Sequence, residues 1–191
     1  MTDINLYFIP TNFYIILIRM YINSVSDVAK LFFSVLSLDT SVLFLNRYLD
    51  VGGKSLNKWY DKFGLVAVLS DVTIIMIGFL IANFIYPFIF SSYSLFLFLG
   101  LVVVVQAIHD ILFYFFIIRP FPKGENQLMD VFKEYAVENG SKIILGDAGL
   151  MLGSAAFMEI YKRLSPINSS ALGVFTVYCL TSILYTKRQA I

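Results

Sequence analysis

The sequence predicts an all-α membrane protein, a polytopic bundle of transmembrane helices, and three observations support this class. Of the 191 residues, 59% are hydrophobic and only 14% are charged, whereas soluble proteins average roughly 45–50% apolar and about 25% charged residues. Four apolar stretches have, or nearly have, the roughly 20 residues that a spanning helix needs. Aromatic residues gather at the ends of these stretches, as they do at the headgroup level of a bilayer.

Four core spans follow from the lengths of these stretches. They cover Phe63–Pro87, Leu95–Arg119, Ile143–Tyr161 and Ser169–Tyr185. The aromatic residues near their ends are Trp59, Tyr60, Tyr86, Tyr93, Tyr161 and Tyr185. We expect one membrane domain over 1–191, in which residues 58–191 form the four-span core.

Residues 1–57 are expected to add one or two hydrophobic helices. The stretches are 6–22, interrupted by Pro10, Asn12 and Arg19, and 28–49, interrupted by Lys30, Asp39 and Arg47. Each stretch either crosses the membrane or lies in its interface, which gives four to six spans in total. Within the second stretch, Ser34, Ser37 and Ser41 recur at a helical spacing, and this predicts a face of small residues against a neighbouring helix.

The segment 120–141, between the second and third core spans, predicts an amphipathic helix over 126–139. Pro120, Pro122 and Gly124 precede this helix, and Gly140 ends it. Its apolar residues recur at helical spacing opposite its charged ones. The helix either rests among the headgroups or binds a partner protein. Lysine and arginine residues cluster in this segment and in the other connections on the same side of the four-span path, so the positive-inside rule predicts that it faces the cytoplasm.

Four ionisable residues lie inside the predicted spans at similar depth, in the half of the bilayer nearer the cytoplasm. They are Asp71, His109, Asp110 and Asp147. Charges at such depth are costly, so they mark either a function or a buried polar joint. The group is suited to binding a cation, relaying protons or catalysis, but the sequence favours a buried hydrogen-bonded network that includes Thr73 and Gln106. No metal-ligand spacing or catalytic motif is present, so the question of a metal stays open, and we expect no catalytic residue and no cofactor.

Glycines in the third core span predict a close approach of helices. Gly146, Gly149 and Gly153 lie on this span, and the last two form a small-xxx-small pattern. Such a pattern serves either packing within one chain or association of two copies. The single cysteine, Cys179, excludes an intramolecular disulfide.

Three stretches resemble a group of uncharacterised multi-pass membrane proteins that large DNA viruses of algae and protists encode. These stretches are VQAIHDILFY at 105–114, PKGENQLMDVFKEYA at 122–136 and ILGDAGLM at 144–151. The resemblance covers roughly residues 58–165. It implies a viral protein in a host-derived or internal virion membrane, and it supplies no established activity or catalytic residues that could be transferred to this chain.

The sequence therefore favours a non-enzymatic membrane component with a structural or assembly role. A small ion or proton channel or transporter that uses the polar cluster is the alternative, and a membrane enzyme that acts on lipid comes third. The expected partner is the lipid bilayer, together with further copies of the chain or other membrane or capsid proteins. The net charge of +1 gives no indication of nucleic-acid binding.

Overall fold

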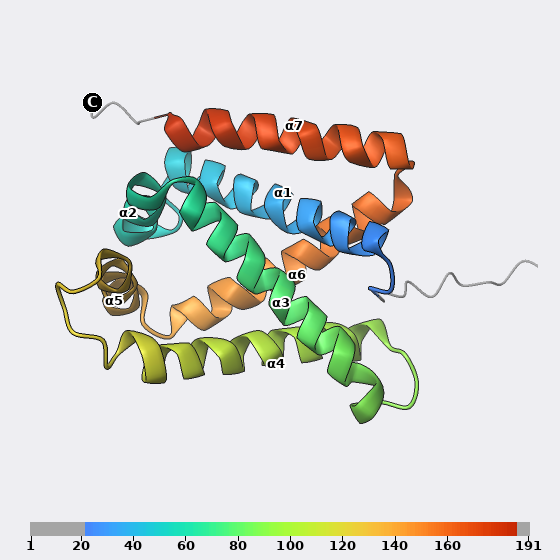
Figure 1. Cartoon of the computed structure of the whole chain (residues 1–191), viewed down its shortest axis with the longest axis horizontal. Helices are drawn as coiled ribbons and strands as arrows, with labels where there is room; N and C mark the ends of the chain where they lie inside the picture. Colours follow the sequence, from blue (N-terminus) through green and yellow to red (C-terminus); the bar gives the residue numbers. More distant parts are fainter. Residues whose placement is uncertain (1–21, 187–191) are drawn as a thin grey trace, which may run out of the picture.

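Helices make up the part of the chain that the computed structural model describes, residues 22–186, and no strand occurs there. The elements are α1 (Val25–Leu49), α2 (Gly53–Phe63), α3 (Leu65–Ile89), α4 (Leu95–Phe113), the π-helical turn η1 (Tyr114–Ile118), α5 (Gln127–Asn139), α6 (Lys142–Arg163) and α7 (Pro166–Tyr185). The all-α class is confirmed (Figure 1).

Five of these helices are long and apolar enough to cross a membrane, namely α1, α3, α4 with η1, α6 and α7. Four of them correspond to the predicted core spans, and α1 is the hydrophobic helix expected over 28–49. The protein is therefore a multi-pass integral membrane protein. The other expected N-terminal stretch, 6–22, lies outside the described residues except for Ile22.

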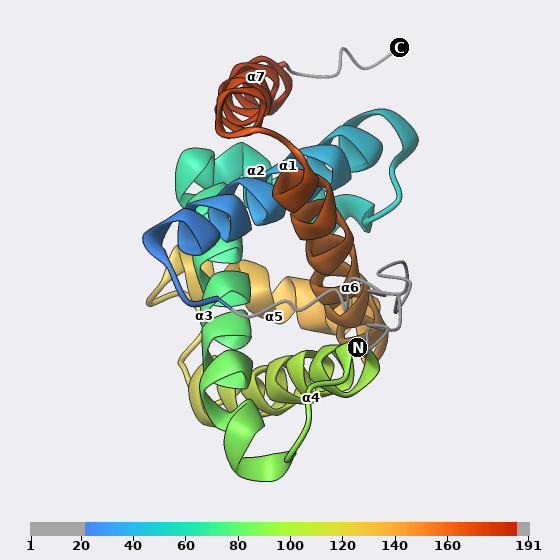
Figure 2. The same cartoon turned by 90° about the vertical axis from the view of Figure 1, so that its right-hand side faces the viewer.

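Four spans form a closed ring in which α1 packs on α3, α3 on α4, α4 on α6, and α6 on α1. Helix α7 lies outside this ring and packs mainly against α1 (Figures 1 and 2). The N-terminal span α1 is thus central, whereas the C-terminal span α7 is peripheral.

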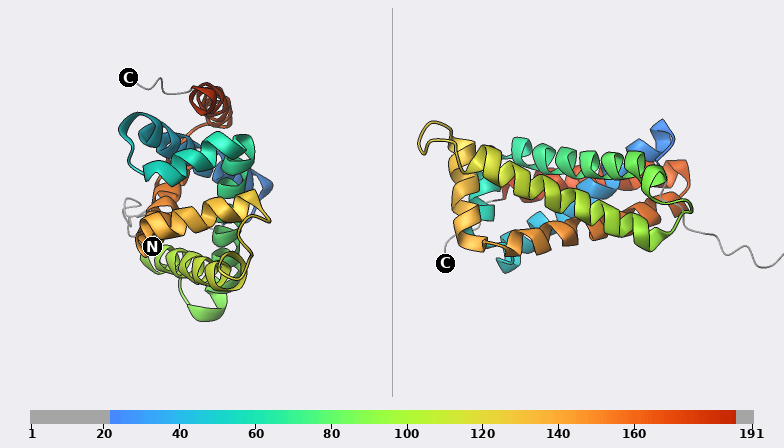
Figure 3. Two further views of the ribbon diagram at one scale, coloured as in Figure 1. Left: turned by 90° about the vertical axis from the view of Figure 1, so that its left-hand side faces the viewer. Right: turned by 90° about the horizontal axis from the view of Figure 1, so that it is seen from below.

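Two short helices, α2 and α5, cover one end of the bundle and contact each other. Helix α5 lies across the ends of the long helices (Figure 3). It corresponds to the amphipathic helix predicted over 126–139, and it begins where the Asn126 side chain accepts hydrogen bonds from the N–H groups of Leu128 and Met129. The sequence analysis did not predict α2. We call these two helices the α2–α5 layer.

Polar residues of α1 connect it to α6 and α7. The Ser37 hydroxyl shares hydrogen bonds with Tyr161 of α6 and Thr176 of α7, each 2.9 Å long. Ser34 is buried, and the Ser41 hydroxyl donates to the Ser37 carbonyl of its own helix. The predicted small-residue face therefore lies against neighbouring helices at Ser34 and Ser37.

The glycines of α6 differ from one another in their surroundings. A Cβ atom on Gly153 would lie 2.9 Å from the Leu38 side chain of α1, so this glycine permits a close helix contact. Gly146 and Gly149 have no such neighbour within 4 Å, so only Gly153 of these three glycines packs closely against another helix of the same chain. Helix α6 crosses α1 at an angle (Figure 2). Two close contacts that the sequence analysis missed involve Gly78, beside Met151, and Gly173, beside Phe33.

Candidate functional site

Two of the predicted site residues, His109 and Asp110, contact each other on α4. The Asp110 Oδ1 atom accepts a hydrogen bond from Gln106 Nε2 at 2.7 Å and lies 3.1 Å from His109 Nδ1. The His109 ring stacks on Phe113, with a centroid separation of 5.6 Å. The side chain of His109 is 37% exposed, whereas that of Asp110 is 16% exposed. The imidazole therefore connects the interior carboxyl to the surface of the bundle.

Asp147 of α6 lies near Asp110 of α4, and the two carboxyl groups interact electrostatically. The Asp110 Oδ2 atom is buried and receives no N–H or O–H donor among residues 22–186. Two ionised carboxylates both accept hydrogen bonds, so they cannot bond to each other without an added proton or cation.

Asp71 of α3 and Asp39 of α1 are both bound by neighbouring residues of α2. Trp59 Nε1 donates to Asp71 Oδ2, and the Tyr60 hydroxyl donates to Asp39 Oδ1, each at 3.0 Å. Asp39 is only 2% exposed, and its second oxygen has no donor among the described residues. Asp71 also lies within electrostatic range of both Asp39 and Asp147.

The structure thus brings all four predicted residues to one region and adds Asp39 to them. We call Asp39, Asp71, Asp110 and Asp147 the acid cluster. The sequence analysis noted Asp39 only as an interruption, although it lies ten residues before the end of α1, the same distance that separates His109 from Arg119. This equal distance from the end of a helix was the signal from which the sequence analysis could have assigned Asp39 to the same depth as the other residues. Thr73, which was expected in the network, is exposed on the outer face of α3, so this expectation is wrong.

Two tyrosines of the α2–α5 layer lie close to the acid cluster. Burial, followed by the nearby Asp147 carboxyl, raises the pKa of Tyr135 to about 12. Burial and the Asp39 carboxyl raise the pKa of Tyr60 well above its usual value. Both phenols therefore keep their protons at neutral pH. Among residues 22–186, no group of three or more His, Cys, Asp or Glu side chains is arranged to hold a metal ion.

The α2–α5 layer is joined by charged and aromatic contacts. Glu138 at the end of α5 accepts hydrogen bonds from the N–H groups of Lys54 (3.1 Å) and Ser55 (2.8 Å), so its carboxylate caps the N-terminus of α2. Gly53 permits this approach for two reasons. Its φ of 79° is a conformation that favours glycine, and a Cβ atom at this position would lie only 2.9 Å from Glu138 Oε1. Lys58 pairs with Glu134, and Trp59 packs on Phe132.

Replacing Glu138 with glutamine is expected to loosen the α2–α5 layer modestly, by about 0.5 kcal/mol, because the cap is exposed. Hydrogen bonds from Ser55 lower the pKa of Glu138 below its ordinary 4.5. The cap therefore stabilises the folded protein at neutral pH, and this contribution is lost as the pH falls through the lowered pKa. Thermal unfolding should show a wild-type advantage at pH 7 that disappears in acid. Glu125→Gln, in the exposed loop, is the control and should show no such advantage.

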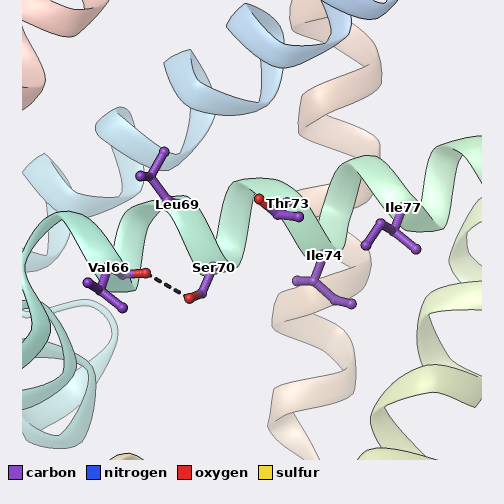
Figure 4. A pocket seen from close by; sticks show the side chains of 6 residues that line it. All are labelled: Val66, Leu69, Ser70, Thr73, Ile74 and Ile77. Carbon is purple, nitrogen blue, oxygen red and sulfur yellow. Dashed lines mark hydrogen bonds between the residues drawn. The ribbon is translucent and has the colours of Figure 1, made fainter.

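A shallow pocket lies on α3, away from the acid cluster. Its lining residues are Val66, Leu69, Ser70, Thr73, Ile74 and Ile77, all from this one helix (Figure 4). Ser70 bonds to the Val66 carbonyl of its own helix, so its hydroxyl is already occupied. The pocket is open and apolar, as expected for a helix surface that faces lipid chains.

Fold and site together define the class of the protein, a helical multi-pass membrane protein with a buried acid cluster beneath a two-helix layer. No protein family, curated protein or solved structure matches this chain.

Proposed function

We propose that this protein is a structural component of a membrane, in which the bundle holds the α2–α5 layer at one bilayer surface. The observation that carries the proposal is the pair of hydrogen bonds from adjacent α2 residues. Trp59 binds Asp71 of α3 and Tyr60 binds Asp39 of α1, so two of the buried acids fasten the layer to two different spans.

The layer also presents the surface at which assembly partners would bind. Its inward face carries Trp59, Tyr60, Phe132 and Tyr135, whereas exposed residues such as Lys54, Lys58 and Glu138 face away from the bundle. A fixed, charged layer of this kind suits recognition of other membrane or capsid proteins that carry complementary charge. The resemblance of stretches within 58–165 to viral membrane proteins leads us to propose a host-derived or internal virion membrane as the location.

An ion or proton pathway is the second candidate, and one observation favours it. His109 is partly exposed and contacts Asp110, which in turn lies near Asp147, so an imidazole links the surface to the cluster. Histidine changes its charge near neutral pH, which is the property that a proton pathway needs. We favour the structural role, because the hydrogen bonds of Trp59 and Tyr60 fix the α2–α5 layer to two different spans.

Flux measurements on the purified protein in lipid vesicles test this choice. For a structural component, proton and potassium flux should equal that of protein-free vesicles, in the wild type and in Asp110→Asn alike. A wild-type flux that a folded Asp110→Asn variant has lost would contradict the proposal and favour the pathway, because the variant keeps a polar amide but loses the titratable group.

A further inference from the structure

Helices α2 and α5 are held to the bundle in different ways. Helix α2 is bonded directly to two spans. Its Trp59 donates to Asp71 of α3 at 3.0 Å, and its Tyr60 hydroxyl donates to Asp39 of α1 at the same distance. Within the described part of the chain, every hydrogen bond or ion pair that joins α5 to another helix goes instead to α2. Polar contacts therefore hold α5 to the spans only through α2.

The polar contacts between α5 and α2 lie at the protein surface. Glu134 of α5 pairs with Lys58 of α2, and both side chains are exposed. Glu138 of α5 accepts hydrogen bonds from the N–H groups of Lys54 and Ser55, and it is exposed as well. Water competes for both partners of an exposed ion pair, so such contacts are individually weak. Separating α5 from α2 is therefore easier than separating α2 from the spans, because the side chains of α2 that bind the spans are buried.

The loop before α5 is bonded to the helix itself. Both carboxylate oxygens of Asp130 accept hydrogen bonds from the Gly124 N–H group, at 3.0 and 3.2 Å. Lys133 donates to the Phe121 carbonyl. Residues 121–139 therefore form one body that can move without breaking its own contacts.

On either side, this body ends at a residue that interrupts the helical backbone. Pro120 precedes it and is exposed, and its missing N–H group prevents η1 from continuing. Gly140 follows it with a φ of 54°, a backbone conformation that favours glycine. No atom of another described helix lies within 4 Å of a Cβ at this glycine. Both connections can therefore turn without disturbing a packed side chain.

Helix α5 covers aromatic side chains at one end of the bundle (Figure 3). The centroid of its Phe132 ring lies 4.8 Å from that of Trp59 in α2 and 5.9 Å from that of Phe113 in α4. Trp59 is buried, and its indole nitrogen binds the Asp71 carboxyl of α3. Moving α5 away would therefore bring water to this indole and to the carboxyl that it binds.

We propose that residues 121–139 form a lid that opens by separating from α2 and turning about Pro120 and Gly140, whereas α2 stays bonded to α1 and α3. The open lid admits water and small solutes from this membrane surface to the contact between Trp59 and Asp71, and the closed lid shields that contact. The inference goes beyond the structural role, because it divides the α2–α5 layer into a fixed helix and a movable one.

Thiol labelling of the full chain in lipid nanodiscs tests the lid. Val131 of α5 is 1% exposed, so a cysteine at this position reacts with a water-soluble maleimide only when α5 leaves the bundle. Cys179 is the single native cysteine and is replaced by alanine throughout. Val137→Cys, at a position 87% exposed on the same helix, gives the rate of a free thiol, and Ser154→Cys, buried in α6, gives the rate for unfolding of the bundle. We expect Val131→Cys to react at least about tenfold faster than Ser154→Cys, because local opening needs less free energy than global unfolding.

Weakening the contacts with α2 should open the lid more often. Adding Glu134→Gln and Glu138→Gln together should speed the labelling of Val131→Cys about fivefold, because both changes remove a charge that binds α2. The same two changes should leave the labelling of Ser154→Cys unaltered. Glu125→Gln is the matched control, because it removes the same charge from the exposed loop, and it should change neither rate.

Hydrogen–deuterium exchange of the unaltered chain keeps the lid testable if a cysteine variant fails to fold. Amides of α5 should exchange faster than those of α2, because a helix of 13 residues is barely stable in water without packing. Equal exchange in the two helices would overturn the proposal. Labelling of Val131→Cys as slow as that of Ser154→Cys would do the same, as would glutamine changes that speed both alike. None of these outcomes involves flux, so the failure of the lid and the failure of the structural role can be told apart.

Discussion

Replacing Gly173 with leucine should detach α7 from α1 and lower the stability of the bundle by about 1–3 kcal/mol. A Cβ atom at this position would lie 2.7–2.8 Å from three ring atoms of Phe33. That ring cannot yield easily, because it packs against Phe32 at a centroid distance of 5.4 Å and against Tyr161 at 6.3 Å. Thermal unfolding in detergent micelles measures the loss.

Gly146→Leu is the matched control for this change. It also adds a leucine to a spanning helix, but no atom of another helix lies within 4 Å of a Cβ at this position, so stability should stay within about 0.5 kcal/mol of the wild type. Equal losses in the two variants would show that the open face of α6 is packed as tightly as α7.

Replacing Asp61 with alanine should cost about 3 kcal/mol, because it leaves a buried guanidinium group without its counter-charge. Arg47 is 8% exposed, and its Nη1 atom lies 2.6 Å from Asp61 Oδ1. The remaining acceptors are neutral and more distant, namely Asn57 Oδ1 at 3.5 Å and the Leu184 carbonyl at 3.3 Å. Arg47→Met should cost less, since Asp61 is 53% exposed and water can solvate its carboxylate.

The Lys58–Glu134 pair provides the comparison for this second prediction. It is as short as the Arg47–Asp61 pair, at 2.5 Å, but both of its side chains are exposed. Lys58→Met should therefore cost under about 1 kcal/mol. Denaturation of Asp61→Ala, Arg47→Met and Lys58→Met in one detergent ranks their losses of stability directly. A loss for Lys58→Met as large as that for Asp61→Ala would contradict the role of burial.

The spans were predictable to the extent that they depend on local properties. The length of an apolar run is such a property, so the expected span Leu95–Arg119 closely matches the observed Leu95–Ile118. The sequence left α1 undecided, because Asp39 and Arg47 make it more polar. Their partners, Tyr60 and Asp61, are adjacent residues of α2, and only the fold brings them to α1.

The unpredicted features depend on which faces of two helices meet. Lysines at 54, 58 and 62 indicated a cytoplasmic connection, yet their four-residue spacing also places Trp59, Tyr60 and Phe63 on the other side of a helix. Similarly, the glycine pattern of α6 shows that a close approach is possible but does not identify the neighbour. Gly153 meets Leu38, whereas Gly149 meets no side chain within 4 Å.

Trp59 gives this protein a built-in optical probe. It is the single tryptophan of the chain, so all indole fluorescence comes from one position. Its ring lies 4.8 Å from that of Phe132 in α5, and its nitrogen binds Asp71 of α3, so one chromophore touches the junction of α2, α3 and α5. The wavelength and quenching of its emission therefore follow the entry of water into this junction, without any attached dye.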